Sequence, residues 1–238
     1  MNKLPDIQGI IFDFGGTLDT NGCHWSEVLW NKYVECRVPV DKETFKAAYV
    51  HGERALSSQP LIKNSDGLYE VLHVKAGLQV AYLLAQGFLD EAAAGGLPER
   101  IARAAYAYAC DMLQKSRLVV EKLYSQHKLV LVSNFYGNIE TILSDFSLLC
   151  FFERVIESAV VGIRKPDPAI YQLGVEALAC PSGNIAVVGD SFRKDMIPAK
   201  ALGCKAVWLR GIGWDEDTDD SLPDVIISSI DQLPEVII

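Results

Sequence analysis

The sequence predicts an α/β fold, a doubly wound parallel sheet with a Rossmann-like core that carries an inserted α-helical cap. Two observations lead to this prediction. Short apolar runs bounded by Gly, Asp or Asn alternate with amphipathic helical patterns, which is typical of right-handed βαβ crossovers. One long segment, residues 21–117, breaks this alternation and contains helical patterns alone.

The expected strands are rich in Val and Ile, as buried parallel strands are. They cover Ile7–Phe12, Lys128–Val132, Val155–Ser158, Ile185–Val188, Ala206–Leu209 and Val225–Ile227. Between them, Asn138 can cap a helix, and Asp167 followed by Pro168 marks the start of another. Gly203 suits the end of a helix over Arg193–Leu202.

The segment 21–117 carries apolar stripes at helical spacing. One stripe begins at Trp25, a second follows Asp41 as N-cap, a third begins at Leu68, and Pro98 opens the last. We interpret the stripes as helix-to-helix packing rather than as a cofactor pocket. The expected division is therefore a helical cap over 21–117 and an α/β core formed by 1–20 and 118–238.

Composition excludes several classes of protein. Half of the 238 residues are hydrophobic, which allows a sizeable core, and the net charge of −9 argues against a nucleic-acid binder with a basic surface. The scattered cysteines form no C-x-x-C pair, so zinc and redox dithiol sites are disfavoured. Without a signal-peptide layout or a membrane-length apolar run, we expect a cytoplasmic protein with no membrane partner. Nothing in the pattern specifies an oligomeric state.

Four motifs each follow an expected strand, where an open α/β sheet places its ligand. The motifs are Asp13-Phe14-Gly15-Gly16-Thr17, Ser133-Asn134, Arg164-Lys165-Pro166-Asp167, and Gly189-Asp190-Ser191 with Asp195 beyond it. Each motif alone is weak, because turn residues, surface lysines and helix caps have the same composition. The four in this order resemble the haloacid dehalogenase superfamily, whose members have an Asp nucleophile, a Ser/Thr, a Lys and an acidic pair. The helices of 21–117 then correspond to that family's helical (C1-type) cap.

The resemblance implies a hydrolase with Asp13 as nucleophile, and the chemistry fits these residue types. A carboxylate can attack phosphorus and form an aspartyl-phosphate, while Lys165 and a metal offset the phosphoryl charge. Mg²⁺ is the expected cofactor, with Asp13, Asp190 and the Gly15 carbonyl as ligands. Asp195 is expected to orient metal-bound water or Lys165. The expected substrate is a small phosphorylated metabolite.

The remaining expectations concern substrate contacts. Ser133 and the N–H groups around Asn134 are expected to hold phosphate oxygens, and Thr17 to orient the nucleophile or its loop. His24 follows the nucleophile loop and can face the cleft, while Arg164 can serve either phosphate or packing. Phe135 and Tyr136 can line the pocket or belong to the core.

Gly15 departs from the family's phosphatases, which carry a second Asp two residues after the nucleophile. That Asp protonates the leaving alkoxide, and a general acid of this kind contributes about a hundred- to ten-thousand-fold. Asp19 is a candidate substitute. Three alternatives therefore stay open beside a phosphatase: a catalytically weak binding or regulatory protein, a dehalogenase, and a phosphonatase. The last would use a cap lysine as a Schiff base, and the cap contains Lys42, Lys46, Lys63 and Lys75.

Overall fold

In a computed structural model that describes residues 2–213 and 219–237, six parallel strands form one sheet, in the order β3-β2-β1-β4-β5-β6. The strands are β1 (Gly9–Phe12), β2 (Lys128–Ser133), β3 (Arg154–Glu157), β4 (Ile185–Gly189), β5 (Lys205–Leu209) and β6 (Val225–Ile227). The predicted doubly wound parallel sheet is confirmed. The predicted core range also includes residues 1, 214–218 and 238, which lie outside the described residues.

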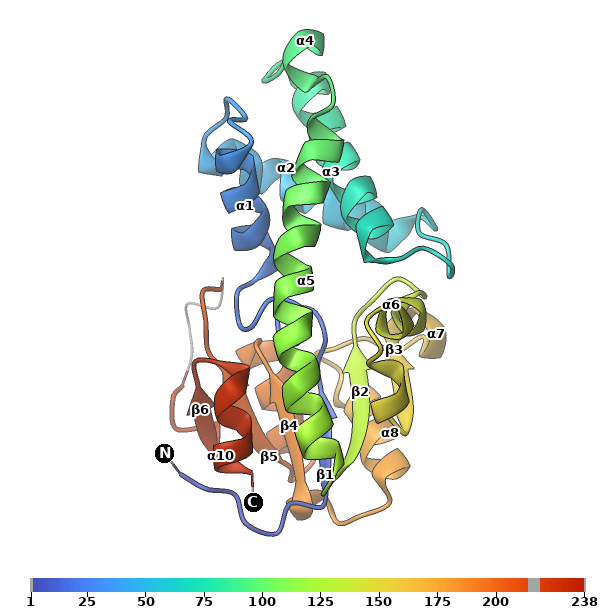
Figure 1. The fold of residues 1–238 in the computed structure, drawn as a ribbon, viewed down its shortest axis with the longest axis vertical. Helices are drawn as coiled ribbons and strands as arrows, with labels where there is room; N and C mark the ends of the chain where they lie inside the picture. Colours follow the sequence, from blue (N-terminus) through green and yellow to red (C-terminus); the bar gives the residue numbers. More distant parts are fainter. Residues whose placement is uncertain (1, 214–218, 238) are drawn as a thin grey trace.

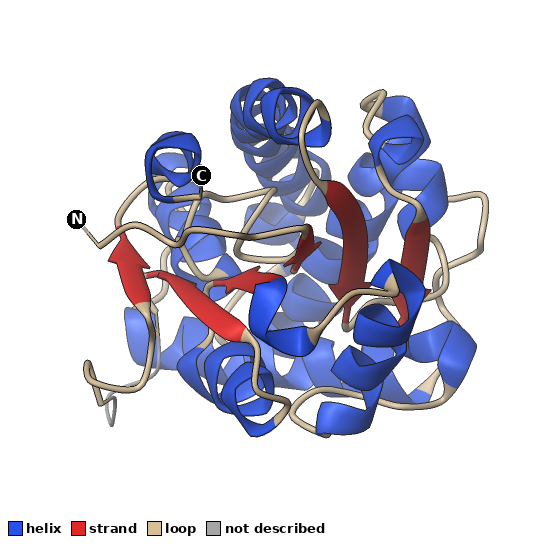
Figure 2. Cartoon of the chain, turned by 90° about the horizontal axis from the view of Figure 1, so that it is seen from below, coloured by secondary structure: helices blue, strands red, loops and turns tan. Residues whose placement is uncertain are grey.

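Helices cover both faces of the sheet because its strands are apolar on both sides (Figure 2). On one face, Ile10 and Phe12 pack in a cluster with the C-terminal part of α5 (Leu97–Tyr124), α6 (Ile139–Asp145) and α10 (Leu233–Val236). On the other face, Ile11 packs with α8 (Pro168–Leu178) and α9 (Ile197–Ala201). The short helix α7 (Ser158–Val161) follows β3. Burial on two faces explains why the strands read as continuous apolar runs.

The inserted segment is helical, as expected. It comprises α1 (Trp25–Glu35), α2 (Lys42–Ser58), α3 (Leu68–Ala85), α4 (Glu91–Ala94) and most of α5. In Figure 1, α1–α4 surround the upper half of α5, and the lower half of the same helix lies along the sheet. The boundary expected at residue 117 therefore falls inside one unbroken helix. The division into cap and core stays a prediction, and a hinge at 117 would have to bend α5.

The helix starts follow the local sequence with two differences. Asp41 and Asp167 accept hydrogen bonds from the N–H groups of their helices, as expected of N-caps. Asn138 precedes α6, but its side chain donates to the carbonyl of Asp66 in the inserted segment instead of capping. The helix expected over Arg193–Leu202 is divided into a π-helical turn, Phe192–Met196, and α9. This wider turn lets Asp195 accept from the N–H of Ser191.

All cysteines are free thiols. Over residues 2–213 and 219–237, no helix is long and apolar enough to cross a membrane.

Candidate active site

The strand order brings the predicted motifs together. Strand β1 lies between β2 and β4, so the loops that follow these three neighbours meet at the carboxyl edge of the sheet. A cavity of about 390 Å³ opens there. The predicted residues that line it are Asp13, Gly15, His24, Ser133, Asn134, Lys165, Asp190 and Asp195.

Asp13, directly after β1, is nearly buried and accepts two hydrogen bonds. Lys165 Nζ donates to its Oδ1 at 2.6 Å, and Thr17 Oγ1 donates to its Oδ2 at 3.1 Å. Thr17 is fully buried and contacts the nucleophile candidate rather than the cavity. The carboxylate of Asp13 is therefore held in one orientation at the floor of the cavity.

Lys165 is held from several sides. Its Nζ also donates to Asp195 Oδ1 at 2.9 Å, and the amide side chain of Asn134 makes hydrogen bonds with both the N–H and the carbonyl of Lys165. Burial would lower the pKa of Lys165, but the carboxylates of Asp13 and Asp195 outweigh it and raise that pKa. The lysine is thus a fixed, protonated cation.

Three carboxylates crowd the same place. One oxygen each of Asp13, Asp190 and Asp195 lies within 4.8 Å of the others. Burial, together with the neighbouring carboxylates, raises the pKa of Asp13 and of Asp190. Among residues 2–213 and 219–237, the side chain that donates to the Asp190 carboxylate is Thr17, through Oγ1 at 3.5 Å. Because one lysine does not balance three acids, this donor set fits a divalent cation that prefers oxygen ligands.

Asp195 lies behind Lys165. Its Oδ1 accepts from Lys165 and from the hydroxyl of Tyr171 at 2.6 Å, and its Oδ2 accepts from the N–H of Ser191. These contacts place it where a residue that orients Lys165 would lie.

The two glycines of the nucleophile loop differ in what surrounds them. Gly16 has a φ of +97°, and a Cβ there would lie 2.3 Å from Asp190 Oδ2, so only glycine fits. Gly15 lines the cavity, and no atom of the described residues other than its chain neighbours lies within 4 Å of where its Cβ would be. The position therefore lies at the cleft and has room for a Cβ.

Some candidate residues lie elsewhere. Arg164 is exposed and, with Phe135 and Tyr136, lines a separate cavity beside the C-terminal end of α2. Asp19 is fully buried, and its two oxygens accept from Gly16 N and Trp25 Nε1, each at 2.7 Å. Asp19 therefore joins the nucleophile loop to the start of α1 and does not line the cleft.

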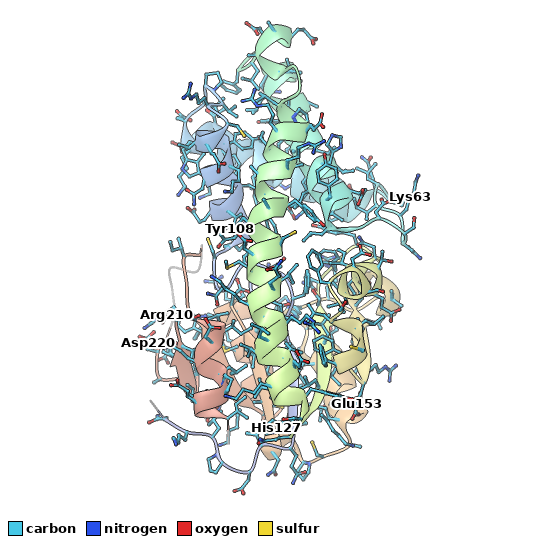
Figure 3. The ribbon with its side chains drawn as sticks, in the orientation of Figure 1. Lys63, Tyr108, His127, Glu153, Arg210 and Asp220 are labelled. Carbon is cyan, nitrogen blue, oxygen red and sulfur yellow. The ribbon has the colours of Figure 1, made fainter. Side chains whose placement is uncertain are left out.

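The four lysines of the inserted segment considered as Schiff-base candidates are paired or exposed. Lys75 is buried and pairs with Glu53 at 2.8 Å, and Lys42 pairs with Glu27 at 2.7 Å. Lys46 is exposed. Lys63 is exposed at the outer edge of the cap in Figure 3.

The cavity also contains residues that sequence reasoning missed. Trp208 donates from Nε1 to the carbonyl of Asp190 at 2.8 Å, and Lys194 and Arg210 line the same wall. Tyr171 supports Asp195 from α8. Helical spacing places Tyr171 beside Ile170 on the inner side of α8, but no local pattern marks its hydroxyl or these cations as parts of a site.

The chain is similar to known proteins in sequence and in structure. The model of the haloacid dehalogenase-like hydrolase family matches residues 7–203. The 5-amino-6-(5-phospho-D-ribitylamino)uracil phosphatase YigB of Escherichia coli (strain K12) is 32% identical over 151 residues, 62% of each chain. Haloacid dehalogenase-like hydrolase domain-containing protein 3 of Danio rerio is 33% identical over 103 residues, 43% of each chain. The chain thus matches less than two thirds of the length of these relatives.

Solved structures share the fold. The putative HAD-hydrolase YfnB from Bacillus subtilis bound to magnesium has a TM-score of 0.58 at 16% identity, covering 97% of this chain and 98% of that one. A dehalogenase solved with an intermediate complex has a TM-score of 0.66 at 17% identity, covering 98% of this chain and 97% of that one.

Proposed function

The chain belongs to the haloacid dehalogenase-like hydrolase family, and from that premise we propose that it is a Mg²⁺-dependent phosphatase acting on a small phosphorylated metabolite in the cytoplasm. The observation that carries the proposal is the buried group of Asp13, Asp190 and Asp195 around a single lysine, with Asp13 open to the cleft. Relatives named as phosphatases support it, among them YigB and the phosphoserine phosphatase of Thermus thermophilus, 36% identical over 80 residues.

The first step uses Asp13 as nucleophile. A carboxylate oxygen forms a bond to phosphorus, the bond from phosphorus to the ester oxygen breaks, and an aspartyl-phosphate results. Lys165 stays protonated and stabilises the negative charge on the phosphoryl oxygens. Ser133 and the N–H groups near Asn134 hold those oxygens, and His24 contacts the rest of the substrate.

The second step returns the enzyme to its starting state. Water attacks phosphorus, the bond to Asp13 breaks, and inorganic phosphate leaves. Gly15 has no side chain that could protonate the leaving oxygen. In the first step, water therefore supplies the proton to that oxygen.

Bound Mg²⁺, held by Asp13, Asp190 and the Gly15 carbonyl, would neutralise phosphoryl charge. We therefore expect the enzyme to favour substrates whose leaving group needs little protonation.

The geometry does not favour the phosphonatase alternative. A Schiff base needs a neutral amine, and Lys75 is the buried lysine among the four candidates in the cap. Burial would lower the pKa of Lys75, but Glu53 and the hydroxyls of Tyr136 and Tyr49 raise it well above its usual value. Lys75 is therefore a protonated ion-pair partner rather than a nucleophile.

The test is turnover of an aryl phosphate with Mg²⁺. Asp13→Asn should lower kcat by about 10⁴-fold or more, because it removes the nucleophile. Asp111→Asn, which changes an exposed acid on α5, is the matched control and should keep wild-type turnover. Equal rates in wild type and Asp13→Asn would reject the nucleophile. Full activity in excess chelator would remove Mg²⁺ from the proposal, and no turnover at all would favour a binding protein or a dehalogenase.

A further inference from the structure

Two cations line the wall of the cleft on the side of β4 and β5. Lys194 belongs to the π-helical turn after β4, and Arg210 directly follows β5. Both line the same cavity as Asp13 and Lys165. Neither has a part in the chemistry described above.

Arg210 is oriented from two sides. Its Nη1 contacts both carboxylate oxygens of Asp220 at 2.7 Å, and the two side chains lie together beside β6 in Figure 3. Its guanidinium lies 5.1 Å from the centroid of the Trp208 ring, and Trp208 is itself fixed by Asp190. Its Nε and Nη2 have no acceptor among residues 2–213 and 219–237. An oriented guanidinium with spare donors is suited to a planar anion.

Lys194 adds a second positive charge without a counter-charge. Its ammonium pairs with no carboxylate in the part of the chain that the structure describes, whereas Lys165 is taken by Asp13 and Asp195. The protein as a whole carries a net charge of −9, which repels anionic ligands. The two positively charged side chains therefore give this wall of the cleft a local charge opposite in sign to the net charge of the protein.

We propose that Lys194 and Arg210 bind a second anionic group, a carboxylate or a phosphate, on the phosphorylated substrate whose phosphoryl group lies at Asp13. This inference rests on the proposed function, and it narrows the substrate class to metabolites with two anionic groups. The guanidinium of Arg210 contacts the anion through its spare N–H donors, and Lys194 contributes charge from an exposed side chain.

The experiment measures binding of probes that the enzyme cannot hydrolyse. Wild-type protein with Mg²⁺ is titrated with phosphonocarboxylates of increasing chain length, each paired with the amide that lacks the second charge. Bisphosphonates of the same lengths test phosphate as the second group. At one chain length we expect the carboxylate or the bisphosphonate to bind about fivefold more tightly than the amide, as two partly exposed ion pairs would give.

Variants assign the preference to the two residues. Lys194→Gln and Arg210→Gln should each reduce the ratio of the two Kd values, and the double variant should bring it close to one. Lys128→Gln changes an exposed lysine at the first residue of β2, at the opposite end of the sheet, and should keep the wild-type ratio. Raising the salt concentration should also shrink the ratio in wild type.

Two outcomes would overturn the proposal: equal Kd values for charged and amide probes at every length, or a preference that survives in the double variant. Because the probes are not hydrolysed, this result does not depend on catalysis. A failure of the proposed function would appear instead as absent turnover of the aryl phosphate. Thermal unfolding checks that the variants fold. If Arg210→Gln does not fold, Lys194→Gln, which alters an exposed side chain, still tests the proposal.

Discussion

Two buried lysines in this protein have closely similar neighbours but differ in the balance of charge around them. Lys165 in the core contacts Asp13 and Asp195 and lies 5.0 Å from the ring of Tyr171, whose hydroxyl donates to Asp195. Lys75 in the inserted helical segment contacts Glu53 and lies 5.3 Å from the ring of Tyr136, whose hydroxyl donates to Glu53. Each is a lysine, a carboxylate and a tyrosine in mutual contact.

The difference lies in the balance of charge. In the inserted helical segment, one lysine contacts one carboxylate, and the pKa of Glu53 is lowered because Lys75 outweighs the effect of burial. At the sheet edge, Lys165 contacts two carboxylates and a third, that of Asp190, lies within 4.8 Å of them. The pKa values of Asp13 and Asp190 are raised there. The ion pair of Lys75 and Glu53 is balanced in charge and joins α2 and α3 to the loop after β2. The group around Lys165 has an excess of negative charge and is suited to bind a cation and a phosphoryl group.

The largest expected effect on turnover comes from removing the negative charge of Asp190. Asp190→Asn should lower phosphatase turnover by about 10⁴-fold, because a metal ligand contributes several kcal/mol to the transition state. The same change should raise the free energy of unfolding in chelator by about 1 kcal/mol, because it removes a repelled carboxylate. Aryl phosphate kinetics and urea unfolding measure the two effects. A variant that loses stability along with activity would contradict the comparison.

Breaking the ion pair of Lys75 and Glu53 should have the opposite effect on the free energy of unfolding. Glu53→Gln leaves Lys75 buried and charged, so we expect it to lower the free energy of unfolding by about 3–5 kcal/mol. The double variant Glu53→Gln with Lys75→Met should recover part of this loss, since it leaves no buried charge. Urea unfolding gives both values. If the double variant loses the full sum of the single losses, the pair is not coupled.

A carboxylate added at position 15 should increase the excess of negative charge at the site and also increase the rate of hydrolysis. The Cβ position is open and its backbone does not have the positive φ of Gly16, so Gly15→Asp should fold. A side chain able to protonate the leaving oxygen should raise kcat/KM for an alkyl phosphate by about a hundredfold. The rate for an aryl phosphate should change much less, and the ratio of the two is the measurement. No gain in a folded variant would mean that another group already supplies the proton.

The smallest effect concerns Asp19, whose two carboxylate oxygens join the nucleophile loop to the start of α1. Burial raises its pKa to about 7 from the usual 3.8, so the folded protein binds this proton more tightly than the unfolded chain does. Its contribution to stability is therefore fully present below about pH 4 and is lost as the pH rises through about 7.

Asp19→Asn removes this titration. Between about pH 5 and about pH 8, the free energy of unfolding should fall by about 2 kcal/mol less in the variant than in wild type. Asp111→Asn, an exposed acid, should keep the wild-type dependence. Identical pH profiles for wild type and Asp19→Asn would show that Asp19 is ionised in the folded protein at acidic pH.

Much of the fold and the main residues of the candidate site were predictable because their signals are local. Strands buried on both faces are short apolar runs, and the residue after each run lies at the carboxyl edge of the sheet. Asp13, Ser133 and Asp190 could therefore be placed at that edge before their contacts were known, whereas Lys165 was singled out by the order of motifs that resembles the family. Their roles stay predictions until the variants are measured.

Other features depended on contacts between distant segments. Arg164 stands next to Lys165 in the sequence but lies in another cavity, because successive residues of an extended loop point in different directions. The division of Arg193–Leu202 into a π-helical turn and α9 follows from the position of Asp195 beneath Ser191, which no helical pattern encodes.

The sequence by itself determined the alternation of strands and helices, the insertion of a helical segment after the first strand, and the Gly at position 15 that departs from the family's phosphatases. These follow from hydrophobic periodicity and from residue identity, which act over a few neighbouring residues. Only the tertiary structure decided that Lys75 is paired while Lys165 is outnumbered, and that Lys194 and Arg210 line the same cleft as Asp13. Charge balance is a property of distances between side chains far apart in the chain, and burial makes those distances count because water no longer screens them.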